Sequence, residues 1–162
     1  MEEGAPDRRL RRSRLISVEV CSALNRTGSK YLVIGGIACI LHGHVHATKD
    51  VDILIDPTLQ NAERILEALS TVGYGFAREL APREIIDRPL FVIGDDPEVD
   101  IFTLAWSVRY KQAVRRSTIV QLDAVKIPLI GLDDLIETKR TGRLQDAADI
   151  EVLEEIKRLR GL

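Results

Sequence analysis

The chain has 162 residues, of which 45% are hydrophobic and 30% charged, and its formal net charge is −2. This composition is typical of a soluble globular protein and excludes a disordered chain. The sequence contains no run of about eighteen apolar residues that would span a bilayer. We therefore expect a single domain over residues 1–162, which buries roughly 70% of its unfolded surface.

The N-terminal segment is charged and does not have the pattern of a secretory signal. Five arginines gather there: Arg8, Arg9, Arg11, Arg12 and Arg14. We expect residues 1–13 to form a flexible basic N-terminus, which is either solvated or in contact with a polyanion. Cys21 and Cys39 both lie in apolar contexts. A disulfide framework is not expected, and a cytoplasmic location fits these cysteines.

Strand and helix patterns interleave along the chain. In order, they predict a helix over Leu15–Leu24, a strand at YLVIG, a helix from Gly35-Gly36 to Gly43, a strand at DVDILID, a helix from Thr58 to Val72, strands at PLFVIG and EVDIFTL, a helix over Ser107–Arg116, strands at STIVQL and VKIPLI, and helices over Leu132–Thr141 and Gln145–Leu159. The predicted fold class is α/β or α+β, with a mixed central β-sheet flanked by helices and with helices at the C-terminus.

The stretch from Lys30 to Asp56 carries three histidines at alternate positions, His42, His44 and His46. In a strand they would share one face, as in a zinc site. The chain has no other histidine, and Gly43 interrupts the run at a predicted helix end. A zinc hydrolase therefore stays open as a minor alternative.

A glycine pair, Gly35 and Gly36, stands where the first predicted strand meets the next helix. The exposed N–H groups and the dipole of a helix start suit a phosphate. A tight turn could need the same two residues without any ligand, and both interpretations remain open here.

Three aspartates provide the strongest signal. Asp50 and Asp52 are two residues apart in a predicted strand, so both carboxylates project to one face. Their repulsion is costly unless a proton or a cation lies between them. Asp100 lies in a later predicted strand. Three carboxylates on neighbouring strands would form an oxygen-rich site that suits Mg²⁺, a metal that typically serves phosphate chemistry.

The order of these motifs, GG at 35–36, DVD at 50–52 and VDI at 99–101, resembles the nucleotidyltransferase superfamily that includes DNA polymerase β. The stretch GGIACILHGHVHATKDVDILI is more closely similar to the minimal, abortive-infection-type nucleotidyltransferases, which are associated with toxin–antitoxin systems. The distal stretch IPLIGLDDLIETKRTGRLQDAADIEVLEEI is similar to the closing helices of that group. His46 stands where such proteins often have arginine. The resemblance covers about residues 30–156 and implies the nucleotidyltransferase fold.

The resemblance also implies roles for individual residues. Asp50, Asp52 and Asp100 would be catalytic and would hold two Mg²⁺ ions, and Asp100 would help to deprotonate the attacking hydroxyl. The residues expected to contact the nucleotide are Gly35, Gly36, Thr48 and Lys139.

Asp146 and Asp149 are three residues apart in the last predicted helix, so they share one face of it. They could orient Lys139 or Arg143 by ion pairing. A surface position for Lys139 remains the alternative. We assign Trp106, Tyr74 and Tyr110 to the core or the rim rather than to base stacking.

The function implied is Mg²⁺-dependent transfer of an NMP from an NTP, ATP included, to a hydroxyl on a protein, an RNA or a small molecule. The partners implied are the NTP, an acceptor macromolecule and a cognate toxin or antitoxin protein, with no membrane. The alternative is a non-catalytic nucleotide-binding or toxin–antitoxin interaction partner.

Overall fold

The computed structural model describes residues 8–95 and 97–162, with side chains from residue 17 onward. The elements in chain order are α1 (Arg8–Arg26), β1 (Tyr31–Ile34), α2 (Gly35–His42), β2 (Val51–Ile55), α3 (Leu59–Ser70), η1 (Gly75–Glu79), α4 (Pro82–Ile86), β3 (Leu90–Ile93), β4 (Val99–Phe102), α5 (Tyr110–Ala113), η2 (Val114–Arg116), β5 (Thr118–Leu122), β6 (Val125–Leu129), α6 (Leu132–Thr138) and α7 (Leu144–Leu159).

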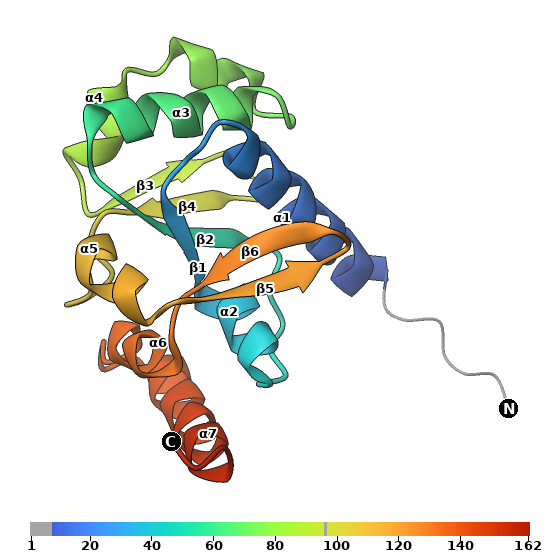
Figure 1. Ribbon diagram of the computed structural model, residues 1–162, viewed down its shortest axis with the longest axis vertical. Coiled ribbons are helices and arrows are strands. Elements are labelled where there is room, and N and C mark those ends of the chain that lie inside the picture. The colour runs from blue at the N-terminus through green and yellow to red at the C-terminus, as the bar shows by residue number, and fades with distance from the viewer. Residues whose placement is uncertain (1–7, 96) are drawn as a thin grey trace, which may run out of the picture.

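Within the described residues, six strands form one mixed sheet in the order β3-β4-β2-β1-β6-β5. The β2–β4 and β1–β6 pairs are parallel, and the other pairs are antiparallel. Helices α1, α3 and α4 lie together above the sheet in Figure 1, whereas α2, α6 and α7 lie together below it. The predicted α/β class with a mixed central sheet and C-terminal helices is confirmed.

The central strands are buried on both sides. Ile53, Leu54 and Ile55 of β2 are each fully buried, because helices cover both faces of the sheet at this position. Strand β3 forms one edge of the sheet, and its Leu90 and Val92 are 41% and 46% exposed. The sheet is therefore uncovered on one face at its β3 edge, on the side where the carboxylate of Asp100 emerges.

Several helix ends and turns have the structure that the local sequence predicts. Thr58 caps α3, since its side chain accepts a hydrogen bond from the N–H of Asn61. Gly43 ends α2 in the left-handed conformation, with φ of 105°. Asp123 and Ala124 both have positive φ between β5 and β6, as in the two-residue type I′ turns that match strand twist.

Other boundaries differ from the prediction. Helix α1 begins at Arg8, seven residues before the predicted start at Leu15. The structure describes side chains from residue 17 onward, so those of the arginine cluster are not among them. The segment predicted as a helix over Ser107–Arg116 contains only the short α5 and η2. Helix α4 was not predicted; it begins with a proline, and the side chain of Glu84 accepts a hydrogen bond from the N–H of Ala81.

Among the helices formed by residues 8–95 and 97–162, we find none with the length and apolar character needed to cross a bilayer.

Candidate active site

Two of the predicted carboxylates face each other across neighbouring strands. Asp52 of β2 and Asp100 of β4 are register partners in the parallel pair, so their side chains leave the same face of the sheet. Asp50 lies one residue before β2, and its Oδ1 accepts a hydrogen bond from the N–H of Glu98 at 3.1 Å. The structure thus brings Asp52 and Asp100 together, whereas Asp50 acts on Asp52 through its charge and has one carboxylate oxygen held by the backbone.

The carboxyl group of Asp52 is in an unfavourable environment for a negative charge. Burial, the hydrogen bond with Asp100 and the negative charges of Asp100 and Asp50 raise its pKa to about 8, against a smaller opposite effect of Lys139. The Oδ1 atom of Asp100 is buried and has no hydrogen-bond partner among the described residues. A buried oxygen without a partner beside a second crowded carboxylate fits a divalent cation with oxygen ligands, such as Mg²⁺.

The glycine pair has a steric explanation in the same site. Gly35 has φ of +67°, and a Cβ atom there would lie 2.7 Å from Cγ of Asp52. A Cβ atom at Gly36 would lie 2.7 Å from Cβ of Thr48. Both positions therefore need glycine so that the start of α2 can approach Asp52 and Thr48. This close approach accounts for the glycines by itself, and a phosphate contact remains a proposal.

Lys139 lies inside the protein and ends α6. Its Nζ donates a hydrogen bond to Oδ2 of Asp149 at 2.9 Å and lies 3.7 Å from Oδ1 of Asp146. Burial alone would lower the pKa of Lys139, but the hydrogen bond to Asp149 and the neighbouring acidic groups raise it. Arg143 also pairs with Asp146, Nε to Oδ2 at 2.9 Å. The predicted ion pairing is confirmed, and the alternative of a surface Lys139 is wrong.

The three histidines do not converge as zinc ligands. His42 ends α2, where its Nε2 lies 2.7 Å from the carbonyl oxygen of Ile130 and its Nδ1 accepts from Arg160. Burial lowers the pKa of His42, which is consistent with a neutral ring. The shared strand face that a zinc site would need does not form, because His42 lies in α2 and the segment from Gly43 to Lys49 forms neither helix nor strand.

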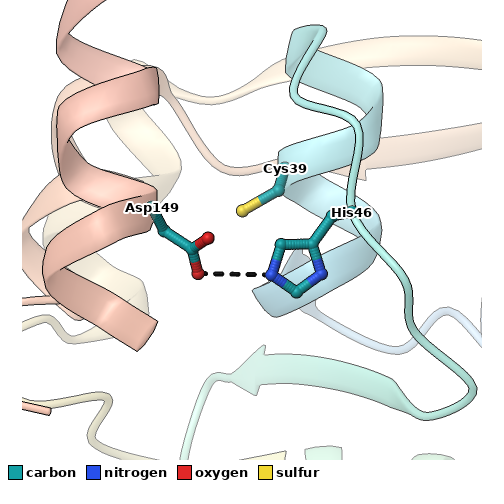
Figure 2. Close-up of side chains that lie close together, drawn as sticks. All are labelled: Cys39, His46 and Asp149. Atoms are coloured by element: carbon teal, nitrogen blue, oxygen red, sulfur yellow. Dashed lines mark hydrogen bonds and ion pairs between the residues drawn. The ribbon is translucent and has the colours of Figure 1, made fainter. Parts of the chain in front are cut away.

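His44 and His46 both turn toward the carboxylate of Asp149. Their Nε2 atoms lie 3.0 Å from Oδ1 and 3.2 Å from Oδ2. Figure 2 shows Cys39 of α2, His46 of the following loop and Asp149 of α7 pointing toward one another. Ligand-type atoms of these three residues lie within 4.8 Å of one another. Asp149 lies more than one hundred residues after Cys39 and His46, so the sequence gave no signal for this cluster.

The cluster has features that oppose a cation. The ammonium of Lys139 already lies on Oδ2 of Asp149, the oxygen that His46 also contacts. Burial raises the pKa of the Cys39 thiol to about 11, so a metal there would have to displace a proton from the sulfur as well as the ammonium from Asp149. Asp149 is best described as an acceptor that holds Lys139, His44 and His46 in place.

A cavity of about 470 Å³ joins these groups. The glycine pair, Thr48, Lys139 and Arg143 line it, as do the carboxylates of Asp52, Asp100, Asp146 and Asp149. The strand order β3-β4-β2-β1 places Asp52 and Asp100 between the glycine pair, which follows β1, and an apolar side toward the β3 edge. The apolar side consists of Leu90, Phe102, Ala105 and Trp106. All the residues that we expected to contact a nucleotide line this cavity; Asp50 does not.

No family model matches the chain, and no curated protein matches its sequence. A solved structure does match: the antigenic nucleotidyltransferase-like protein of Paracoccidioides brasiliensis. It superposes with a TM-score of 0.58 and 16% sequence identity, over 91% of this chain and 75% of that one. The chain has a nucleotidyltransferase-like fold. At this identity the match shows the fold alone, and the nucleotidyltransferase-like fold is what the sequence resemblance implied.

Proposed function

We propose that the protein is a Mg²⁺-dependent nucleotidyltransferase, which transfers an NMP from an NTP to a hydroxyl group. The observation that carries this proposal is the Asp52–Asp100 pair. It combines a raised carboxyl pKa with a buried oxygen that has no partner among the described residues. Both carboxyl groups line a cavity that the buried Lys139 also lines. Pure binding of a nucleotide does not require such a crowded carboxylate pair.

In this proposal Asp50, Asp52 and Asp100 hold two Mg²⁺ ions. When bound, the ions supply charge neutralisation for the triphosphate and activation of the acceptor hydroxyl. A carboxylate oxygen of Asp100 that does not bind a metal would accept the hydroxyl proton, as the acceptor oxygen bonds to the α-phosphorus and the bond from the α-phosphorus to pyrophosphate breaks. In this proposal Asp52 acts as a metal ligand rather than as this base.

The phosphates occupy the side of the cavity that the glycine pair lines. No described side chain caps the start of α2, so the N–H groups of Gly35 and Gly36 are available to β- and γ-phosphate oxygens. Lys139 supplies a fixed positive charge that Asp149 orients, and Thr48 supplies a hydroxyl. His46, also at the cavity, stands where an arginine would grip phosphate, and its contact with Asp149 limits how far it can reach.

The type of nucleotidyltransferase, its donor, its acceptor and its partner protein are also proposals. We infer an enzyme of the abortive-infection type, with ATP or another NTP as donor, a protein, an RNA or a small molecule as acceptor, and a cognate toxin or antitoxin protein as partner. The support for this assignment is the likeness of the segment from Gly35 to Ile55 and of the C-terminal helices to that group.

Transfer of label tests the proposed function. The protein is incubated with each NTP labelled at the α-phosphate, with Mg²⁺ and with a cell lysate as the source of acceptor. We expect one class of macromolecule or small molecule to become labelled, and Asp52→Asn to abolish the labelling. Nucleotide binding without any transfer or release of pyrophosphate would instead support a non-catalytic nucleotide-binding partner. Zinc in the purified protein with hydrolysis but no transfer would support a hydrolase.

A further inference from the structure

Trp106 has an unusual backbone conformation for a large side chain. Its φ is +57°, and the residue occupies a two-residue turn in which Ala105 and Val108 exchange both backbone hydrogen bonds at 3.0 Å. A positive φ at the first central position is the pattern of type II′ turns, where glycine is usual. The indole is 57% exposed, so burial in the core does not compensate for this strain. Strain of this kind concentrates at functional sites.

The turn places Trp106 at the rim of the candidate active-site cavity. Its apolar side also includes Phe102 and Leu90, which are register partners on β4 and β3. Asp100 lies two residues before Phe102 and so shares its face of the sheet. Apolar residues therefore line the cavity on the β3 side of the carboxylate pair, and the glycine pair lies on the β1 side.

We propose that Trp106 is the platform on which the nucleobase of the donor NTP stacks. This inference rests on the proposed function and replaces our expectation from the sequence that Trp106 takes no part in base stacking. An NTP has an anionic end and a planar aromatic end, and the two carboxylates lie between the glycine pair on the β1 side of the cavity and apolar residues on its β3 side. The volume of about 470 Å³ lies in the range of small-ligand sites.

Stacking on an aromatic ring is tolerant of base identity, since every base has a π-face. We therefore expect all four NTPs to bind, with a common contribution from Trp106. The strained turn fixes the orientation of the indole before the ligand arrives, and this preorganisation lowers the ordering cost of binding.

Fluorescence gives a direct test, because Trp106 is the only tryptophan of the chain. The probes are Mg²⁺ with a non-hydrolysable ATP analogue, Mg²⁺ with tripolyphosphate, and a short single-stranded oligonucleotide. We expect the ATP analogue to change the emission of Trp106 and tripolyphosphate to leave it nearly unchanged. Calorimetry measures binding of the same ligands independently of the fluorophore.

Variants separate stacking from a structural role. Trp106→Ala should raise the Kd for the ATP analogue by about 5- to 150-fold, with little effect on tripolyphosphate, whereas Trp106→Phe should retain most of the affinity. Trp106→Gly relieves the strained φ, so it should raise the Tm while weakening nucleotide binding. The matched control is Phe76→Ala, which removes an aromatic side chain that is 48% exposed and does not line this cavity.

Two outcomes would overturn stacking while leaving the proposed function intact. One is calorimetric binding of the nucleotide with unchanged emission and equal Kd in Trp106→Ala. The other is an emission change with the oligonucleotide only, which would assign Trp106 to an acceptor instead. Failure of the wild-type protein to bind any Mg·NTP would overturn both the inference and the proposed function.

Discussion

Gly35 allows the start of α2 to lie directly against the carboxyl group of Asp52. A Cβ atom built on Gly35 would lie 2.7 Å from Cγ of that side chain, which is too close for any side chain larger than hydrogen. The glycine also has φ of +67°. Two separate costs, a steric one and a conformational one, therefore oppose substitution at this position.

Gly28 allows the two costs to be separated. Its φ is +70°, and a Cβ atom there would meet nothing within 4 Å. Gly28→Ala should lower the free energy of unfolding by about 1–2 kcal/mol from the left-handed backbone alone. Gly35→Ala should cost a further ~1–3 kcal/mol from crowding against Asp52. Denaturant unfolding of both variants measures the difference. Equal losses would contradict the close approach of α2 to Asp52.

Asp52→Asn should abolish nucleotidyl transfer while the fold survives. The amide keeps the shape of the side chain and cannot ionise, so the variant avoids the cost of a carboxyl group whose pKa is raised by burial and two neighbouring carboxylates. The free energy of unfolding of the metal-free variant should therefore equal or exceed that of the wild type. Activity assays and denaturant unfolding with EDTA test the two parts. Near-normal turnover, or an unfolded variant, would show that Asp52 does not have the assigned role.

Asp100→Asn should have a different kinetic signature. Asp50 and Asp52 remain to bind the nucleotide-carrying metal, so the Kd for Mg·NTP should change little. The chemical step should slow by about 10²–10⁴-fold, because the variant cannot accept the hydroxyl proton. Single-turnover kinetics with calorimetry separate these quantities. A loss of NTP affinity equal to that of Asp52→Asn would contradict this division of roles.

Asp149 contributes stability that depends on pH. Burial alone would raise its pKa, but hydrogen bonds from Lys139 and His44 and the positive charge of Lys139 lower it to about 2. A carboxyl group with a lowered folded-state pKa stabilises the protein above its unfolded pKa, near ~4, and this contribution is lost as pH falls toward about 2. Acid unfolding of the wild type should begin in this window.

Asp149→Asn should remove this pH dependence. At neutral pH it leaves the ammonium of Lys139 buried without its nearest countercharge, with an expected loss of about 3–5 kcal/mol. The difference from wild type should shrink as pH falls through the window. The matched control is Asp133→Asn, because Asp133 pairs with Lys157 at 2.8 Å but is 66% exposed; it should cost less than about 1 kcal/mol. A constant difference at all pH values would exclude titration of Asp149 as its origin.

The parts of the fold that sequence reasoning predicts are those with strong local patterns. The apolar run of β1, the alternation in β2 and the turn at Asp123-Ala124 each follow from residues adjacent in the chain. The carboxylate pair was also predicted, although only the β2–β4 register shows that Asp52 faces Asp100.

The remaining features depend on contacts between distant residues. Nothing near Asp149 in the sequence indicates that it holds His44 and His46, and the histidine spacing by itself pointed only to the zinc alternative. The turn at Trp106 lacks the usual glycine and was not predicted. One helix was predicted over Ser107–Arg116, where the structure has only the short α5 and η2. These positions break local rules, as functional sites often do.

The position of the metal tests the central claim most directly. Binding of Mn²⁺, used in place of Mg²⁺, is followed by electron paramagnetic resonance with a non-hydrolysable NTP analogue in the wild type, Asp52→Asn and Cys39→Ser. We predict that the wild type and Cys39→Ser bind Mn²⁺ equally and that Asp52→Asn loses this binding. Loss of binding in Cys39→Ser with retention in Asp52→Asn would place the metal at the Cys39–His46–Asp149 cluster of Figure 2 and contradict the account.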